Sequence, residues 1–351
     1  MTSIAGYEIV TEFTTAGGGQ SRWAFARRGG RDYFIKEFLS PKYPVDGAPG
    51  GEATKDRQRR QCDAFEMHHR AIIEALEPIS SRGGNVVVAT DFFRAGPRYF
   101  KVTDKVEVTD WSPEEVAALP IKARLLLMIT VAHSLNVLHR VGLVHGDIKP
   151  PNILIKRLAG GGWGTKLIDF DNAVLTDKRL PDPKDLVGDM AYYSPEIVRY
   201  LNDGDAATRL TGGSDLFALG LVFCEWMTSQ KPALDSGARY AGVAVLRGDG
   251  IAVPDMGYPA IGALVKSMLA TTATERPSAE AVHRELREVR AGLPDEGDRP
   301  SPVSAPGALT TSSLRGTLGG RPRPPAPTRD AGESAGGSRL RGTLVRKDSS
   351  R

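Results

Sequence analysis

The stretch "HGDIKPPNILI", residues 145–155, decides how the rest of the chain is interpreted. It places Asp147, Lys149 and Asn152 two and three residues apart in one short loop, and the apolar run at its end indicates a strand. Further along, "TKLIDFDNA" puts Asp169 at the end of a second apolar run. A loop aspartate, a lysine, an asparagine and a strand-end aspartate form a set that suits phosphoryl transfer.

Each of these four side chains suits a separate part of such a transfer. Asn152 and Asp169 can hold Mg²⁺ on the phosphates of a nucleotide. Asp147 can orient the attacking hydroxyl and accept its proton, and Lys149 can neutralise charge on the moving phosphoryl group. Taken one at a time, however, the aspartate and the asparagine are more typical of an ordinary turn.

The set resembles the catalytic machinery of the eukaryotic-like serine/threonine protein kinases, and the resemblance covers about residues 7–293. "HGDIKPPNILI" is similar to the family's catalytic loop at every functional position except one, where Gly146 replaces an arginine. "LIDFDNA" resembles the metal-binding motif, with Asp171 in place of the usual glycine. Three further motifs follow in the family's order: "GDMAYYSPE" ending in Ser194-Pro195-Glu196, "SDLFALG" with Asp215, and "ERPSAEAV" with Arg276.

The three downstream motifs carry structural expectations of their own. The resemblance implies that Asp215 braces the backbone of the catalytic loop and that Arg276 pairs with Glu196. Each motif alone is a weak signal, but five motifs in order and at family-like separations are highly specific together.

The pattern of secondary-structure signals predicts an α+β fold with a cleft between two lobes. Strand signals occupy residues 7–14, 21–28, 31–38, 85–93 and 98–106, interrupted by a helical stretch at 63–79. Arg28-Gly29-Gly30-Arg31 is a plausible hairpin turn, and helical periods dominate after residue 112. With the resemblance, we expect a bilobal protein-kinase-like fold: a small β-rich, ATP-binding N-lobe at 7–106, a larger helical, catalytic C-lobe at 107–293 and a tail at 294–351.

A glycine-rich turn in the N-lobe, "TTAGGGQSRWAFA", is expected to cover the phosphates of ATP. Gly17, Gly18 and Gly19 keep this turn flexible enough for the backbone to close over them. When the turn is aligned on Trp23 and Ala26, only the middle glycine falls on one of the family's three glycine positions.

Lys36, mid-strand in "YFIKEF", resembles the lysine that contacts the α- and β-phosphates. Its expected partner on the helix is Glu66. Glu52 and Glu74 remain alternatives because the insert at residues 40–61 blurs the alignment.

The hinge between the lobes is expected near residues 103–106. There the backbone groups of Asp104 and Val106 would face adenine. The cofactors that the resemblance implies are ATP and Mg²⁺ (or Mn²⁺), and the implied partner is a protein substrate.

Three departures from the family pattern bear on regulation. Gly146 removes a cation that commonly binds a phosphate on the activation segment, so we expect activity without phosphorylation there. Asp189 replaces a threonine that usually bonds to the catalytic aspartate and lysine, and its charge could raise the pKa of Asp147. Asp171 could help to bind Mg²⁺ or misplace Asp169. Solvated, harmless carboxylates at both positions are the interpretation we favour.

Two other classes of protein share part of the pattern. Small-molecule kinases that phosphorylate aminoglycosides or choline have similar "HGD" and "IDFD" strings, but Lys149 and the three downstream motifs favour a protein kinase. A nucleotide-binding pseudokinase scaffold is the non-enzymatic alternative. Retention of Lys36, Asp147, Asn152 and Asp169 weighs against it.

The tail after residue 293 differs in composition from everything before it. It is rich in Pro, Gly, Ser and Arg with few apolar residues, so we expect it to be disordered. Its 10 basic and 6 acidic residues account for the whole formal charge of +4. Thr317 and Thr343 lie in two copies of "LRGTL" and are candidate autophosphorylation sites for a phosphothreonine-binding (forkhead-associated) partner. An inert solubilising tail fits the composition equally well.

Composition narrows the class of protein. With 40% apolar and 25% charged residues, the chain is typical of a soluble globular protein. Cys62 and Cys224 lack metal-ligand spacing and indicate reduced thiols in the cytoplasm. We expect no signal peptide and no membrane span. We also expect no nucleic-acid partner, because the excess basic charge lies in the tail. A ratio of 32 Arg to 14 Lys hints at a GC-rich bacterial genome.

Overall fold

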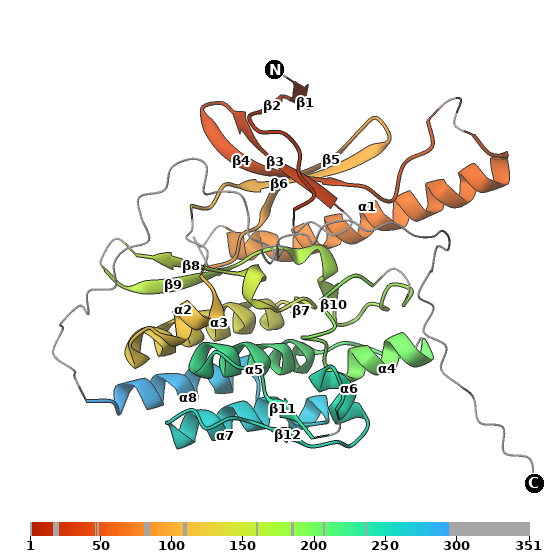
Figure 1. Ribbon diagram of the computed structural model, residues 1–351. Coiled ribbons are helices and arrows are strands. Elements are labelled where there is room, and N and C mark those ends of the chain that lie inside the picture. The colour runs from red at the N-terminus through yellow and green to blue at the C-terminus, as the bar shows by residue number, and fades with distance from the viewer. Residues whose placement is uncertain are drawn as a thin grey trace, which may run out of the picture. The chain divides into compact units, whose positions relative to one another are not determined.

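The computed structural model divides as the sequence predicted, into a strand-rich part followed by a helical part (Figure 1). The α+β, bilobal fold is confirmed, and the expected boundary at residue 106 falls between the end of β6 and the start of α2. The predicted disordered tail lies outside the described residues, apart from residue 294. The structure describes residues 2–16, 21–45, 47, 49–80, 85–107, 111–158, 161–183, 186–205, 208–235 and 237–294.

The first part is built on a six-stranded antiparallel sheet with the order β1-β2-β3-β4-β6-β5. Its hairpin between β3 and β4 has the predicted bounds. Gly29 and Gly30 in the turn have φ angles of 56° and 77°, a conformation that favours glycine. The strands are β1 (Ser3–Ile4), β2 (Tyr7–Ile9), β3 (Ser21–Arg28), β4 (Arg31–Phe38), β5 (Ala89–Ala95) and β6 (Arg98–Asp104).

The two faces of this sheet differ in polarity. Successive side chains along a strand alternate between faces. On one face Ile35 packs with Phe100 and Val102 in an apolar cluster. Lys36 and Lys101, which are cross-strand partners in the register of β4 and β6, therefore share the opposite face. That face is turned toward the cleft described below.

Helix α1 (Glu52–Ser80) begins eleven residues before the predicted start at residue 63. Most of these added turns fall within the expected insert at residues 40–61. They are polar, but they consist largely of good helix formers, and Lys55 with Glu52 and Arg59 with Asp56 make ion pairs one turn apart. Apolar periodicity does not indicate them, because no side chain before Cys62 in this helix is buried.

The second part packs helices around the buried helix α5. Helix α3 lies against α5, α8 and β9. The helices are α2 (Pro113–Ala117), α3 (Ile121–Arg140), α4 (Pro195–Asp203), α5 (Gly212–Thr228), α6 (Ala241–Leu246), α7 (Pro259–Met268) and α8 (Ala279–Ala291). Short antiparallel pairs join β7 (Leu143–Val144) with β10 (Val174–Leu175), β8 (Ile153–Arg157) with β9 (Trp163–Leu167), and β11 (Ala233–Leu234) with β12 (Ile251–Ala252).

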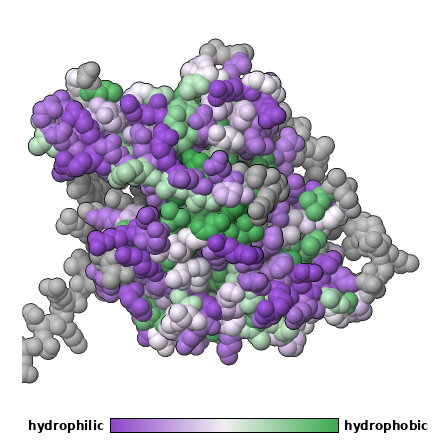
Figure 2. Space-filling model, turned by 180° about the vertical axis from the view of Figure 1, so that it is seen from behind, coloured by the Kyte–Doolittle hydropathy of each residue, from purple (hydrophilic) through white to green (hydrophobic). Residues whose placement is uncertain are grey.

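Apolar residues gather mainly inside this helical core. Among the described residues, α3 is the one helix long and apolar enough to cross a membrane by length and composition, but about half of that stretch is buried against its neighbours. Seen from behind, the surface is largely hydrophilic. Hydrophobic residues come to the surface near mid-height, between the sheet and the helical part (Figure 2).

The implied pairing of Arg276 with Glu196 is confirmed. Two guanidinium nitrogens meet the two carboxylate oxygens at 2.7 and 3.0 Å, and the Arg276 side chain is 0% exposed. Further donations from Arg276 reach the carbonyls of Gly213, Ala270 and Thr271. One buried cation therefore ties the start of α4 to the start of α5 and to the loop before α8.

We expect Arg276→Met to lower the free energy of unfolding by about 3–5 kcal/mol, because it leaves the buried Glu196 carboxylate without its cation. Urea denaturation followed by circular dichroism measures the change. The matched control is Arg284→Met on the exposed face of α8, expected to stay within about 0.5 kcal/mol of wild type. Equal losses in the two variants would contradict this assignment.

Candidate active site

Asp215 of α5 holds the start of the loop at residues 145–152, which resembles the family's catalytic loop. The backbone amides of His145 and Gly146 donate to its two oxygens at 2.8 and 2.9 Å, and His139 Nε2 lies 2.9 Å from Oδ2. The residue is 1% exposed. Burial by itself raises the pKa of this carboxyl, but the hydrogen bond and charge of His139 hold the pKa below its usual value. The brace implied by the resemblance is confirmed.

Above this brace, Asp147, Lys149 and Asn152 come together as the spacing predicted. Lys149 Nζ lies 2.8 Å from Asp147 Oδ2. The Asn152 amide donates to the backbone oxygen of Asp147 at 2.8 Å and to Oδ2 at 3.0 Å. Burial raises the pKa of Asp147, and Lys149 opposes that rise. The carboxylate is thus fixed by two donors and partly shielded from water.

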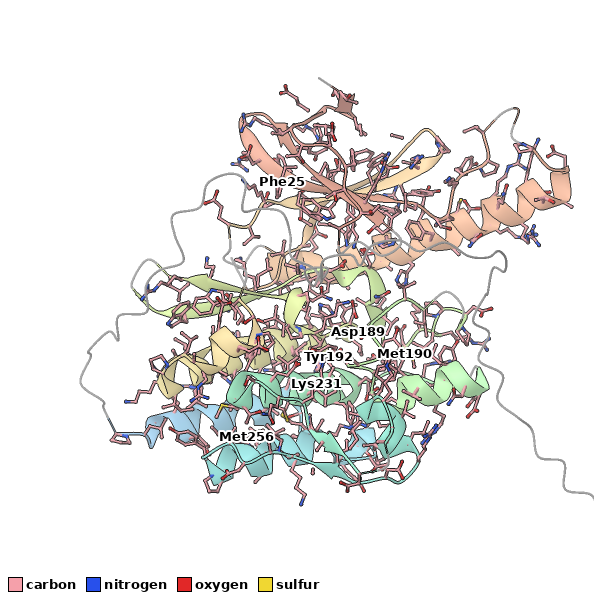
Figure 3. All side chains as sticks on the ribbon, viewed as in Figure 1. Phe25, Asp189, Met190, Tyr192, Lys231 and Met256 are labelled. Atoms are coloured by element: carbon pink, nitrogen blue, oxygen red, sulfur yellow. The ribbon has the colours of Figure 1, made fainter. Side chains whose placement is uncertain are left out.

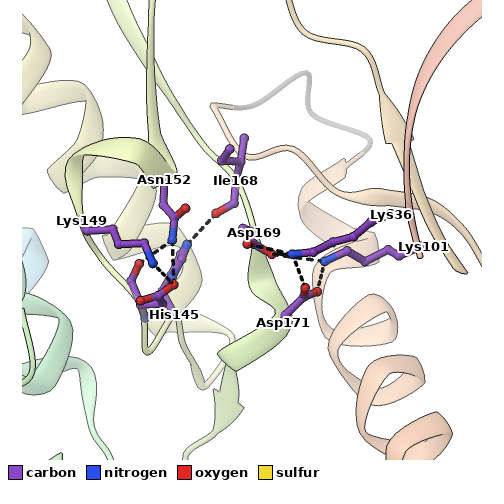
Figure 4. A network of polar contacts seen from close by, with 9 residues as sticks. Lys36, Lys101, His145, Lys149, Asn152, Ile168, Asp169 and Asp171 are labelled. Atoms are coloured by element: carbon purple, nitrogen blue, oxygen red, sulfur yellow. Dashed lines mark hydrogen bonds and ion pairs between the residues drawn. The ribbon is translucent and has the colours of Figure 1, made fainter. Parts of the chain in front are cut away.

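Asp169 lies beside this loop because the two segments are hydrogen-bonded to each other. Ile168 N donates to the backbone oxygen of Asn152 at 3.1 Å, and His145 Nε2 lies 3.0 Å from Ile168 O (Figure 4). Asp169 itself has φ 63° and ψ 73°, a left-handed conformation that aspartate tolerates better than most residues. Its side chain stays partly exposed at the cleft.

The donor chemistry of Asn152 and Asp169 fits Mg²⁺. An amide oxygen and a carboxylate are hard oxygen ligands, and Mg²⁺ in nucleotide sites takes its remaining ligands from phosphates and water. Among the residues that the structure describes, no group of three His, Cys, Asp or Glu side chains could hold a metal ion by itself. A metal at this position would therefore depend on the nucleotide that it accompanies.

Lys36 reaches across from the sheet to residues 167–173, which resemble the family's metal-binding motif and are called the metal-binding segment below. Its Nζ lies 3.0 Å from both carboxylate oxygens of Asp169 and 2.6 Å from Asp171 Oδ2 (Figure 4). Burial lowers the pKa of Lys36, but the two carboxylates outweigh burial and raise it, so the ammonium stays charged.

The expected pairing of Lys36 with Glu66 is wrong. Glu66 Oε2 lies 3.8 Å from Arg70 on its own helix, and both ion pairs of Lys36 are with aspartates of the metal-binding segment. Consecutive helical residues are rotated by about 100°, so Glu66 is turned away from the face that Phe65 presents to the cleft. The alternatives also fail: Glu52 pairs with Lys55, and Glu74 is exposed.

Asp171 is paired with two lysines and its side chain is only 17% exposed, which corrects the favoured interpretation of a solvated carboxylate. Besides Lys36, it contacts Nζ of Lys101 on β6, which also lies 3.6 Å from Asp169 Oδ1. Burial raises the pKa of Asp171, but Lys101 and Lys36 outweigh burial and hold it well below its usual value.

Asp189, by contrast, is exposed and caps a turn by accepting a hydrogen bond from Ala191 N at 2.9 Å. The segment beyond it is fastened to α5. Tyr192 Oη donates to Glu225 Oε2 at 2.8 Å, and Lys231 Nζ lies 4.5 Å from the centre of the Tyr192 ring (Figure 3). Asp189 thus agrees with the solvated interpretation.

A cleft of about 920 Å³ joins these groups. Its size lies in the range of small-molecule and cofactor sites. The lining includes Lys36, Asp147, Lys149, Asp169 and Asp171, so these five residues open into one space. Asn152 is buried behind them and does not line the cleft.

The remaining predicted nucleotide contacts are placed only in part. Gly17, Gly18 and Gly19 lie outside the described residues. Asp104 ends β6 opposite Tyr33, and Val106 follows two residues later, where the chain leaves the sheet. Their contact with adenine stays a prediction.

Lys101 belongs to the charged cluster of the site, although the sequence did not predict it there. A signal for it existed, because "YFKVTD" places this lysine mid-strand among apolar neighbours, as "YFIKEF" places Lys36. The contact of Lys101 with Asp171 spans 70 residues of sequence, so no local pattern indicates that the two side chains meet.

The chain is similar to known kinases. A family model described as "Protein kinase domain" matches residues 54–286. Serine/threonine-protein kinase PknJ of Mycobacterium tuberculosis is 30% identical over 211 residues, 57% of this chain and 34% of its own length. Serine/threonine-protein kinase Pkn1 of Myxococcus xanthus is 28% identical over 255 residues, 67% of this chain and 35% of its own length.

A third relative, serine/threonine-protein kinase PkaA of Streptomyces coelicolor, is 28% identical over 268 residues, 74% of this chain and 47% of its own length. The chain thus spans between a third and a half of the length of these relatives.

Gly146 has a structural reason to be glycine. Its φ is 75°, and a Cβ atom there would lie 2.6 Å from the backbone oxygen of Asn172. We expect Gly146→Ala to lower the free energy of unfolding by about 1–3 kcal/mol more than Gly96→Ala does. Gly96 is the matched control because it also has a positive φ, 59°, but open space around it. Thermal and urea unfolding measure both. Equal losses of unfolding free energy in the two variants would show that the loop accommodates a side chain at residue 146 without strain.

Proposed function

Because the chain belongs to the protein kinase family, we propose that it transfers the γ-phosphate of ATP to serine and threonine hydroxyls of proteins. The observation that carries the proposal is one cleft in which Lys36 from the sheet meets Asp169, and which Asp147 and Lys149 also line. The names of the bacterial relatives support the same activity.

The catalytic roles follow from the contacts within the loop. Asp147 would accept the proton of the attacking hydroxyl, since it lines the cleft and Asn152 fixes its carboxylate. Lys149, 2.8 Å from that oxygen, would shift to the charge that develops on the transferred phosphoryl group. Mg²⁺ or Mn²⁺, held by Asn152 and Asp169, would supply positive charge to the phosphate oxygens when bound.

The nucleotide would be held mainly from the sheet. Lys36 carries an ammonium at the cleft, and its charge suits the α- and β-phosphates. We assign Gly17, Gly18 and Gly19 to the turn over the phosphates, and the backbone of Asp104 and Val106 to adenine. These assignments rest on the resemblance and on the course of the chain after β6.

Activity is proposed not to require phosphorylation of the activation segment. The usual phosphate-binding arginine is replaced by Gly146, and the backbone oxygen of Asn172 leaves no room for a side chain there. The end of the segment is already fastened by the hydrogen bond from Tyr192 to Glu225. Phosphatase-treated protein is therefore the form to assay.

The proposed setting is the reducing cytoplasm of a bacterium. Cys62 and Cys224 are both buried and unpaired, which supports a compartment that keeps thiols reduced. The proposed partner is a protein substrate.

We expect phosphatase-treated wild type to transfer label from ATP with Mg²⁺ to itself and to a generic protein acceptor. Asp147→Ala should reduce the rate at least about 100-fold, because it removes the proton acceptor. Asp203→Ala, at an exposed site on α4, is the matched control and should keep wild-type activity.

The same assay separates the rival functions. Label on an aminoglycoside or choline instead of protein would indicate a small-molecule kinase. Transfer that persists in Asp147→Ala, or that is absent from wild type, would contradict the proposal. Absence of transfer from wild type would favour a pseudokinase.

The tail is proposed as a substrate in cis, because a tethered hydroxyl has a high effective concentration at the active site of its own chain. Thr317 and Thr343 of the two "LRGTL" copies are the expected sites, and their phosphates would bind a forkhead-associated domain. Mass spectrometry after incubation with MgATP should find both modified in wild type and neither in Asp147→Ala. Unmodified threonines in an active preparation would reject this idea.

A further inference from the structure

Two lysines that are largely shielded from water lie side by side on the cleft face of the sheet. Lys36 and Lys101 are directly opposite each other in the register of β4 and β6, and their side chains are only 12% and 11% exposed. Like charges at directly opposite positions of a sheet repel each other, and burial strengthens that repulsion. The pair therefore needs a carboxylate between its two ammonium groups.

Asp171 supplies that carboxylate. One of its oxygens lies 2.6 Å from Lys36 Nζ, and the other contacts Lys101 Nζ (Figure 4). Its side chain is 17% exposed. One carboxylate thus bridges both lysines, and it approaches Lys36 more closely than Asp169 does, at 3.0 Å.

Asp169 alone would not neutralise Lys36 and Lys101 once a nucleotide with its metal ion is bound. Two lysines and two aspartates balance in charge, but a metal ion at Asp169 would draw on that carboxylate. Asp171 would then be the carboxylate left to hold Lys36. It lies two residues from Asp169, so one short segment would position both the metal ligand and the phosphate-binding lysine.

Helix α1 offers no substitute. Its described residues that line the cleft are not acidic: Gln61, Ala64, Phe65, His68 and His69. The place where the resemblance puts a helix glutamate against Lys36 is thus taken by a side chain from the metal-binding segment.

We propose that Asp171 is the positioning residue for Lys36, with Lys101 as its counter-cation, and that it does the work expected of a glutamate on α1. The inference rests on the nucleotide-binding part of the proposed function. In this arrangement the orientation of Lys36 follows the metal-binding segment and not the position of α1.

The test measures Mg·ADP affinity by titration calorimetry and thermal unfolding without nucleotide, so neither readout needs turnover. Four variants of the full chain are compared with wild type: Asp171→Gly, Lys101→Met, the double variant Lys101→Met/Asp171→Gly, and Glu66→Gln.

Asp171→Gly is expected to weaken Mg·ADP binding about 10-fold or more and to lower the unfolding temperature, because both lysines lose a buried partner. Lys101→Met should bind Mg·ADP within about 3-fold of wild type, because the pair between Asp171 and Lys36 remains. In the double variant the unfolding temperature should return toward wild type, while nucleotide binding stays as weak as in Asp171→Gly. Glu66→Gln should bind as wild type does.

Recovery of both stability and Mg·ADP affinity in the double variant would overturn the proposal, because Asp171 would then serve only to neutralise Lys101. A loss of affinity in Glu66→Gln as large as in Asp171→Gly would also overturn it. The kinase function is judged separately. Wild type that shows the expected binding pattern but transfers no phosphate would end that function and leave this inference intact.

Discussion

The site depends first on one buried carboxylate. Asp215 accepts hydrogen bonds from the backbone amides of His145 and Gly146 at 2.8 and 2.9 Å, and His139 Nε2 lies 2.9 Å from its Oδ2. A buried anion without donors would be costly, so the loop above it has little freedom to move away. Because α5 is buried along most of its length, this anchor is as rigid as the core. The positions of Asp147 and its neighbours follow from it.

A second set of charges links the sheet to that anchored part. Lys36 and Lys101 extend from β4 and β6, and the carboxylates of Asp169 and Asp171 meet them from the segment after β9. The hydrogen bond from Ile168 N to Asn152 O ties this segment to the catalytic loop. Charge pairing across the cleft therefore sets the distance between Lys36 and Asp147.

Local patterns in the sequence predicted much of this. The hairpin at Gly29 and Gly30 was found because two adjacent glycines between alternating strands suit one turn geometry. The sequence did not predict the start of α1, because residues 52–61 include no buried side chain and periodicity detects only helices that pack. Glu66 was chosen by its residue type, but its direction depends on how the whole helix is rotated against the sheet.

The sequence by itself determined the order of the motifs, the residues of the catalytic loop and the family-like fold, because these rest on short-range spacing and on the steric rules of turns and strands. Only the tertiary structure decided which charges meet. Lys101 and Asp171 are 70 residues apart, and nothing in their local sequence states that they share a contact. A buried ion pair forms where packing brings two side chains together with water excluded, and that depends on every element between them.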